Sequence, residues 1–100
     1  MPLDFYDITD IHLNSKLFEV GYADFEVLEP ILSSFTKTTG LTIDPYATTR
    51  MYAGHVRLII SLIQEYLIKL KRDKPEEYKT LSRMLTHFES VQEGFIIVGD

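Results

Sequence analysis

The segment from residue 52 to residue 72 places the strongest constraint on the fold. Apolar and aromatic side chains recur there at alternating spacings of four and three residues: Tyr52, Val56, Ile59, Ile63, Tyr66 and Leu70. This spacing predicts an α-helix over 52–72 with these side chains on one face. Leu58, Ile60, Leu62 and Leu67 widen the apolar face. Because a helix this apolar is stable only when most of its surface is covered, we expect it to run through the middle of the domain.

A second helix is predicted between Asp24 and Gly40. Apolar residues from Phe25 to Phe35 follow helical spacing, and Gly40 is a natural C-terminal stop. Pro30 conflicts with this pattern, because proline inside a helix removes a backbone hydrogen bond and clashes with the preceding turn. Either the helix is kinked at Pro30 or its regular part starts close to Pro30, and we favour a regular helix over about residues 29–39.

A third helix is predicted from Pro75, which suits the first helical position, to a stop at Gly94. The basic residues between the two later helices complement the dipole at the end of helix 52–72 and indicate a solvated helix end rather than a nucleic-acid site. They are Lys69, Lys71, Arg72 and Lys74.

The ends of the chain predict short strands. Residues 95–98 are aromatic and β-branched, and glycines bound them. Residues 3–8 and 17–22 fit either strands or loosely packed terminal segments. A lone strand needs a partner, which favours their pairing with residues 95–98. Residues 41–51, which include the turn signal Asp44-Pro45, are predicted to be an irregular connector. The expected fold is α+β but mainly α: three helices packed on a small sheet formed by the terminal segments, in a single domain of residues 1–100.

Charge is distributed unevenly along the chain. Residues 1–45 contain eight acids and two bases, a balance of −6, whereas residues 46–100 contain seven acids and eight bases, a balance of +1. Nucleic-acid binders usually carry a basic face, so direct nucleic-acid binding is disfavoured. An acidic half favours a cationic partner and accelerates its approach.

The sequence favours a cytoplasmic protein. The first residues lack the basic and then apolar pattern of a secretory signal, and polar residues interrupt the densest apolar stretch, 58–70. We therefore expect no membrane association. The absence of cysteine also suits a reducing compartment.

No motif for catalysis is present. The chain has no Gly-x-Ser-x-Gly, no phosphate-binding Gly-rich loop, and no ligand spacing among His12, His55 and His87. His55, beside Gly54, is the best candidate for an enzymatic alternative. Asp4, Asp7 and Asp10 recur every third residue, which indicates a solvated acidic edge or a partner contact more than a metal site. We expect a binding protein with no catalytic residue, metal or cofactor.

Two stretches carry a resemblance to a known family. The first is Phe-Thr-Lys-Thr-Thr-Gly-Leu-Thr-Ile-Asp-Pro-Tyr at residues 35–46, continuing through Thr49-Arg50 into the long apolar helix. The second is the segment 94–100, which ends in Val-Gly-Asp. Together they resemble the small immunity proteins of contact-dependent growth inhibition and related polymorphic toxin systems.

The resemblance implies a small, cytoplasmic, non-enzymatic bacterial protein that binds a cognate toxin domain. In such families the toxin is often a nuclease, and the immunity protein often covers its active site. A nuclease must be cationic to hold nucleic acid, so an acidic surface can occupy the same groove. Tyrosine and arginine are favoured interface anchors. The expected contact residues are Asp4, Asp7, Asp10, Glu19, Asp24, Glu26, Asp44, Tyr46 and Arg50.

A self-associating adaptor or structural protein is the alternative. In that case part of the apolar face of helix 52–72, including Ile68, would be buried between subunits. The immunity hypothesis instead predicts a monomer or a weak dimer. Sedimentation distinguishes the two.

Overall fold

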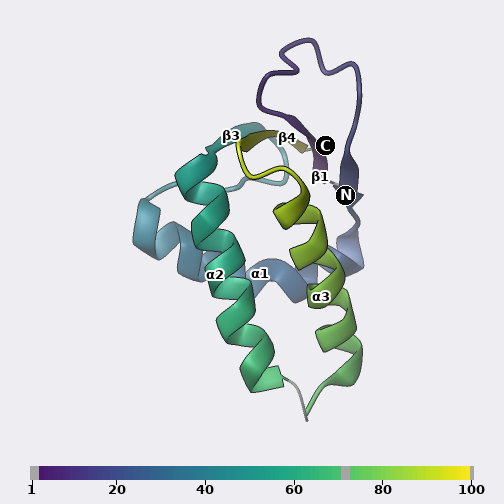
Figure 1. Ribbon diagram of the computed structural model, residues 1–100, viewed down its shortest axis with the longest axis vertical. Coiled ribbons are helices and arrows are strands. Elements are labelled where there is room, and N and C mark those ends of the chain that lie inside the picture. Colours follow the sequence, from purple (N-terminus) through teal and green to yellow (C-terminus); the bar gives the residue numbers. More distant parts are fainter. Residues whose placement is uncertain (1–2, 71–72, 100) are drawn as a thin grey trace.

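The computed structural model describes residues 3–70 and 73–99, which form three helices and one four-stranded antiparallel sheet (Figure 1). This arrangement confirms the predicted α+β class, with helices packed on a sheet to which both ends of the chain contribute. In chain order the elements are β1 (Leu3–Asp7), β2 (Phe18–Val20), α1 (Tyr22–Thr39), β3 (Thr48–Tyr52), α2 (Ala53–Leu70), α3 (Pro75–Ser90) and β4 (Gly94–Gly99).

The two ends of the chain meet in the centre of the sheet. The strand order is β2-β1-β4-β3, so β4 lies between the first strand of the chain and β3. Phe5 is opposite Ile97 in one ladder, and Thr49 is opposite Ile97 in the other. The predicted pairing of both N-terminal segments with the C-terminal strand is therefore confirmed for β1, whereas β2 pairs with β1 instead.

The prediction that residues 41–51 are wholly irregular was wrong. Thr48–Tyr52 forms the edge strand β3, in which Thr49 and Met51 are buried and the alternate residues Thr48, Arg50 and Tyr52 are exposed. This alternation is the pattern of a strand with one face on a core. The turn signal at Asp44-Pro45 marks only the first part of the connector.

The start of the first helix was also predicted wrongly. The helix α1 begins at Tyr22, well before residue 29, and Pro30 lies inside it. Pro30 is exposed, while Leu28 and Ile31 beside it are buried in the core. We attribute the continuity of the helix to this packing, which outweighs the lost hydrogen bond. The predicted stop is confirmed, because Gly40 caps the helix in the left-handed conformation with φ of 78°.

The two later helices confirm most of the predicted pattern, but Tyr52, predicted to lie on the buried face of helix 52–72, ends β3 instead and is exposed. The helix α2 spans Ala53–Leu70 and contributes five buried residues, and α3 begins at Pro75 as predicted but ends at Ser90, before Gly94. Lys71 and Arg72 of the predicted basic cluster lie outside the described residues. Within the described ranges, none of the helices has the length and hydropathy needed to span a membrane.

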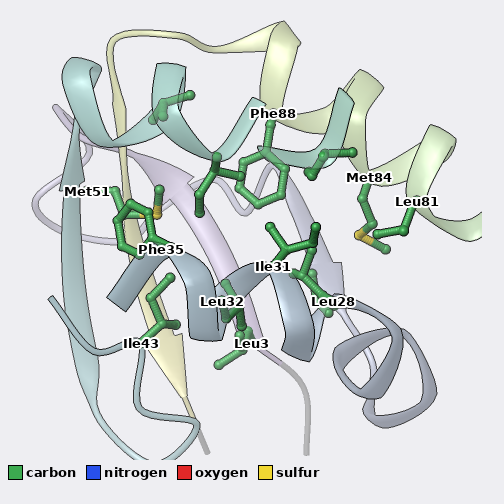
Figure 2. Close-up of a cluster of buried hydrophobic side chains, with 14 of the residues drawn as sticks. Leu3, Leu28, Ile31, Leu32, Phe35, Ile43, Met51, Leu81, Met84 and Phe88 are labelled. Atoms are coloured by element: carbon green, nitrogen blue, oxygen red, sulfur yellow. The ribbon is translucent and has the colours of Figure 1, made fainter. Parts of the chain in front are cut away.

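The core lies between the helices and one face of the sheet (Figure 2). Phe5 of β1 stacks on Phe18 of β2 with ring centroids 4.5 Å apart, and Phe88 of α3 meets Phe5 edge-on at 5.6 Å. The buried residues of β1, such as Leu3 and Phe5, alternate with residues that point to the opposite face. This opposite face, which we call the outer sheet face, includes Asp4, Tyr6, Glu19, Arg50, Tyr52, Ile96 and Val98.

Candidate functional site

A surface groove runs between α1 and the connector that follows it. Two adjoining hollows, of about 510 and 220 Å³, share Phe25, Glu29 and Pro45 and so form one continuous depression. We call it the α1 groove. Its residues from α1 are Tyr22, Phe25, Glu26, Glu29, Leu32, Ser33, Thr36 and Lys37, and its residues from the connector are Thr42, Ile43, Pro45 and Tyr46.

The floor of the α1 groove is part of the hydrophobic core. Leu32 and Ile43 are both only 7% exposed, and they lie close to Leu3 of the central sheet (Figure 2). At the rim, Tyr22 and Tyr46 are 64% and 70% exposed. The groove therefore combines an apolar floor, fixed by close packing, with two aromatic side chains free to contact another molecule.

Local hydrogen bonds shape the connector wall of the groove. The Thr36 hydroxyl donates to the carbonyl of Leu41 at 2.9 Å, just after the turn at Gly40. Asp44 Oδ1 accepts the backbone N–H of Tyr46 at 2.8 Å, which is the turn that its aspartate-proline sequence predicts. These bonds hold the backbone of Tyr46 at the rim of the groove.

The end of β4 anchors this wall to the sheet. The backbone N–H of Gly99 donates to the carbonyl of Ala47 at 2.9 Å. A side chain at position 99 would collide with the carbonyl of Pro45, so the two backbones approach as closely as only glycine permits. The wall thus has a fixed position relative to the central strands.

The charges of the groove are separated along its length. Glu26 and Glu29 are exposed on neighbouring turns of α1 near Tyr22, and Lys37 lies toward the other end of the helix. Among the described residues, neither glutamate takes part in an ion pair. One end of the groove is therefore acidic without internal compensation, and this end attracts cationic groups.

Asp4, Glu19 and Arg50 lie elsewhere, on the outer sheet face. Lys16 Nζ lies 3.3 Å from Glu19 Oε2 and 3.6 Å from Asp4 Oδ1, and the hydrogen bond to Glu19 together with both negative charges raises the pKa of Lys16. The two acids are therefore already partly compensated. Arg50 is opposite Ile96, two strands away from Asp4.

Asp7 and Asp10 shape the loop between β1 and β2, which projects from the body of the molecule (Figure 1). Asp7 Oδ1 accepts the backbone N–H and the hydroxyl of Thr9 at 2.9 and 2.7 Å, and these bonds lower the pKa of Asp7. Asp10 accepts the backbone N–H groups of Ser15 and Asn14, which lower its pKa in the same way. Both carboxylates therefore have structural partners within the loop.

Asp24, another of the predicted contact residues, forms an ion pair between two helices. Its Oδ2 lies 2.9 Å from Nη2 of Arg83, so it joins α1 to α3.

Of the predicted contact residues, the structure brings only Glu26 and Tyr46 into the α1 groove, and Asp44 shapes its wall. The prediction missed Tyr22, Phe25 and Glu29, although their spacing of three and four residues places them on one helical face with Glu26.

His55 is not among the residues that line the α1 groove. His55, the sequence candidate for catalysis, accepts the backbone N–H of Tyr52 at 3.1 Å through Nδ1 and packs against Phe35, so it stabilises the start of α2. Over residues 3–70 and 73–99, no group of three or more His, Asp or Glu side chains is placed to hold a metal ion. No protein-family model, curated protein or solved structure was found to match this chain.

Proposed function

We propose that this protein is a cytoplasmic immunity protein that binds and neutralises a cationic bacterial toxin domain, a nuclease by our expectation. The observation that carries the proposal is the α1 groove, in which two glutamates that form no ion pair among the described residues lie beside exposed tyrosines over an apolar floor. The groove belongs to the half of the chain with a charge balance of −6. Such a surface matches a basic surface in charge and offers aromatic anchors.

On this basis the protein neutralises the toxin by competing with nucleic acid for the cationic site of the toxin. A nuclease holds phosphates with lysine and arginine side chains. Carboxylates such as Glu26 and Glu29 satisfy the same cations, and the apolar floor adds the desolvated contact that excludes water. The stretch of residues 35–46 that carries the resemblance to immunity proteins includes the connector wall of the groove.

Affinity capture with salt as the variable tests this proposal. Tagged protein is incubated with native extract of the producing cells, and captured proteins are identified by mass spectrometry at low and high salt. We expect a basic nuclease or toxin fragment in stoichiometric amount, held less tightly as salt screens the charges. Adding purified protein to the isolated partner must then abolish the activity of the partner. A captured partner that keeps full activity in the complex would contradict neutralisation.

The oligomeric state decides between this proposal and the self-associating alternative. On α2, Ile68 is 79% exposed, whereas Leu58, Ile60 and Leu62 pack against the core. One exposed isoleucine on a helix is ordinary for a monomer surface. We expect sedimentation at micromolar concentration to show a monomer or a weak dimer, and an obligate oligomer would support the alternative.

A further inference from the structure

We propose that the α1 groove receives an extended segment of the partner chain in which basic and apolar side chains alternate. This inference rests on the proposed function for the partner, because it names what the toxin inserts into the same site. It predicts a binding chemistry that short peptides can test without the toxin.

The length of the groove fits a short extended segment. Its residues on α1 run from Tyr22 to Lys37. At about 1.5 Å of rise per residue, this stretch of helix is roughly 22 Å long. An extended chain advances about 3.3 Å per residue, so six or seven residues fill the groove.

The surface of the groove demands alternation. Apolar side chains on one side of the segment meet the floor at Phe25, Leu32 and Ile43. Successive side chains of an extended chain point to opposite sides, so the residues between them face the rim and solvent. Basic residues at these positions reach Glu26 and Glu29, which lie three residues apart on the same side of α1.

The charge separation determines which basic residues of the segment contribute to binding. Those near Tyr22 are attracted by Glu26 and Glu29, whereas a basic residue at the other end meets repulsion from Lys37. An acidic segment of the same shape meets repulsion from both glutamates. The charges of the groove thus select a positively charged segment, and the apolar floor selects a segment with an apolar residue at every second position.

A second copy of this chain is the poorer occupant. The described segment that most resembles the required one is the loop between β1 and β2, which exposes Ile11, Leu13 and Leu17. Its one lysine, Lys16, lies 3.3 Å from Glu19 Oε2 and 3.6 Å from Asp4 Oδ1 of its own molecule. The basic half of the required contact is therefore already paired within this segment's own molecule.

The test uses two blocked hexapeptides, one alternating arginine and leucine and the other alternating glutamate and leucine. Each is titrated into the full-length, isotopically labelled protein, and amide chemical shifts are followed by NMR. For the arginine peptide we expect saturable shifts centred on Phe25, Glu29, Thr42 and Tyr46, and for the glutamate peptide no such shifts. Shifts centred on the outer sheet face, or the absence of saturable shifts, would overturn the proposal.

Charge variants with a matched control separate specific pairing from net charge. The double variant Glu26→Gln/Glu29→Gln is expected to weaken binding of the arginine peptide about five-fold, the size typical of two exposed ion pairs. The control Glu65→Gln/Glu89→Gln makes the same change in net charge at exposed positions on α2 and α3 and leaves binding unchanged. If the two double variants weaken binding of the arginine peptide equally, the effect comes from the net charge of the protein, and the proposal is overturned.

Tyrosine variants test the rim. Tyr46→Ala is expected to remove the peptide-induced shifts at its end of the groove, whereas Tyr52→Ala, at an exposed tyrosine on the outer sheet face, leaves them intact. If the protein self-associates and Glu26→Gln/Glu29→Gln abolishes that association, a second copy is the occupant and the proposal fails. Because these readouts use peptides, they can be separated from the test of the immunity function. If the arginine peptide binds the groove but no toxin is captured, only the immunity function is rejected. If a toxin is captured and neutralised but the peptide does not bind the groove, only the groove proposal is rejected.

Discussion

Asp10 uses both of its carboxylate oxygens at once. Oδ1 accepts the backbone N–H of Asn14 and Oδ2 accepts that of Ser15, each at 3.0 Å. The residues around it include Leu13, which has a positive φ of 56°, an unfavourable conformation for a side chain of this size. We attribute the fixed shape of the loop at residues 8–17 to these carboxylate bonds together with those of Asp7.

Replacing Asp10 by Asn should therefore loosen the loop without unfolding the protein. An asparagine offers one acceptor oxygen, so at least one of the two N–H groups loses its partner. We expect faster amide hydrogen exchange at Asn14 or Ser15 and unchanged exchange in the core, measured by NMR. Glu93→Gln, at an exposed acid far along the chain, serves as the control. Equal exchange in Asp10→Asn and the natural protein would show that the bonds do not hold the loop.

Acid should have the same effect as this substitution. Hydrogen bonds from Ser15 and Asn14 favour the charged carboxylate and lower the pKa of folded Asp10 below 3.8. A lowered folded-state pKa means that the stabilisation is complete above the unfolded-state value and is lost as pH falls through the folded-state value. A pH titration of the Asn14 and Ser15 amides should show the loop loosening only below pH 3.8. Loosening that begins near neutral pH would contradict this assignment.

At the scale of elements, β4 depends on a glycine at its first position. Gly94 has φ of 138°, and a Cβ there would collide with the carbonyl of Met51 and lie 3.2 Å from Cβ of Ile8. The backbone of β3 and residue Ile8, whose backbone N–H donates to the carbonyl of Gly94 at 3.2 Å, thus converge on this residue. The entry of the last strand into the sheet requires the absence of a side chain.

Gly94→Ala should destabilise the fold by about 3 kcal/mol or more, because backbone strain adds to a steric clash that no flexible group can relieve. Gly54→Ala is the matched control, since its Cβ would meet nothing closer than Arg57 Nη2 at 3.9 Å. In helix α2 this change should be neutral or stabilising by about 0.5 kcal/mol. Denaturant unfolding of the two variants measures both effects, and equal stabilities would refute the argument.

Elements with a strong apolar pattern could be predicted from the sequence, and elements decided by distant contacts could not. Periodicity alone located α2, and Pro75 located the start of α3. The sequence of α1 was misinterpreted because Pro30 carries a local cost, whereas the packing of Leu28 and Ile31 against other elements is invisible in the local pattern. The alternation at Thr48–Tyr52 was available but was hidden by the adjoining turn and helix.

The candidate site was harder to predict than the fold, for a related reason. Charge counting found the acidic half but not which acids have partners. Asp24 is compensated by Arg83, a residue 59 positions away in the sequence, and Asp10 by its own loop. Glu29, which has no ion pair among the described residues, was left out of the predicted set. Only the folded arrangement shows that it shares a groove with Tyr46.

For the molecule as a whole, β4 is the element on which the sheet depends. It pairs with β1 on one side and β3 on the other, and its Phe95 and Ile97 are fully buried. The remaining strands form only the short β1–β2 ladder. A two-stranded ladder is marginal in water, so the helices alone would have to hold the rest of the fold together.

A chain shortened to residues 1–92 should therefore lose its cooperative fold. We expect it to keep some helical signal in far-UV circular dichroism but to melt without a sharp transition, because two ladders and two core side chains are removed. Adding a synthetic peptide of residues 91–99 in excess should restore part of the transition. A sharp melt of the shortened chain near that of the full protein would show that β4 is dispensable.

The central position of β4 also has a consequence for synthesis on the ribosome. The strand β1 is made first, yet its main partner is the last element of the fold to be made. Until Gly94–Gly99 emerges, the backbone edges of β1 and β3 that pair with β4 are unpaired and the core lacks Phe95 and Ile97, so the nascent chain is prone to aggregate. The sheet therefore cannot assemble progressively behind the growing chain. A chain interrupted before Gly94–Gly99 would also lack Gly99, whose backbone N–H holds the connector wall of the α1 groove through Ala47.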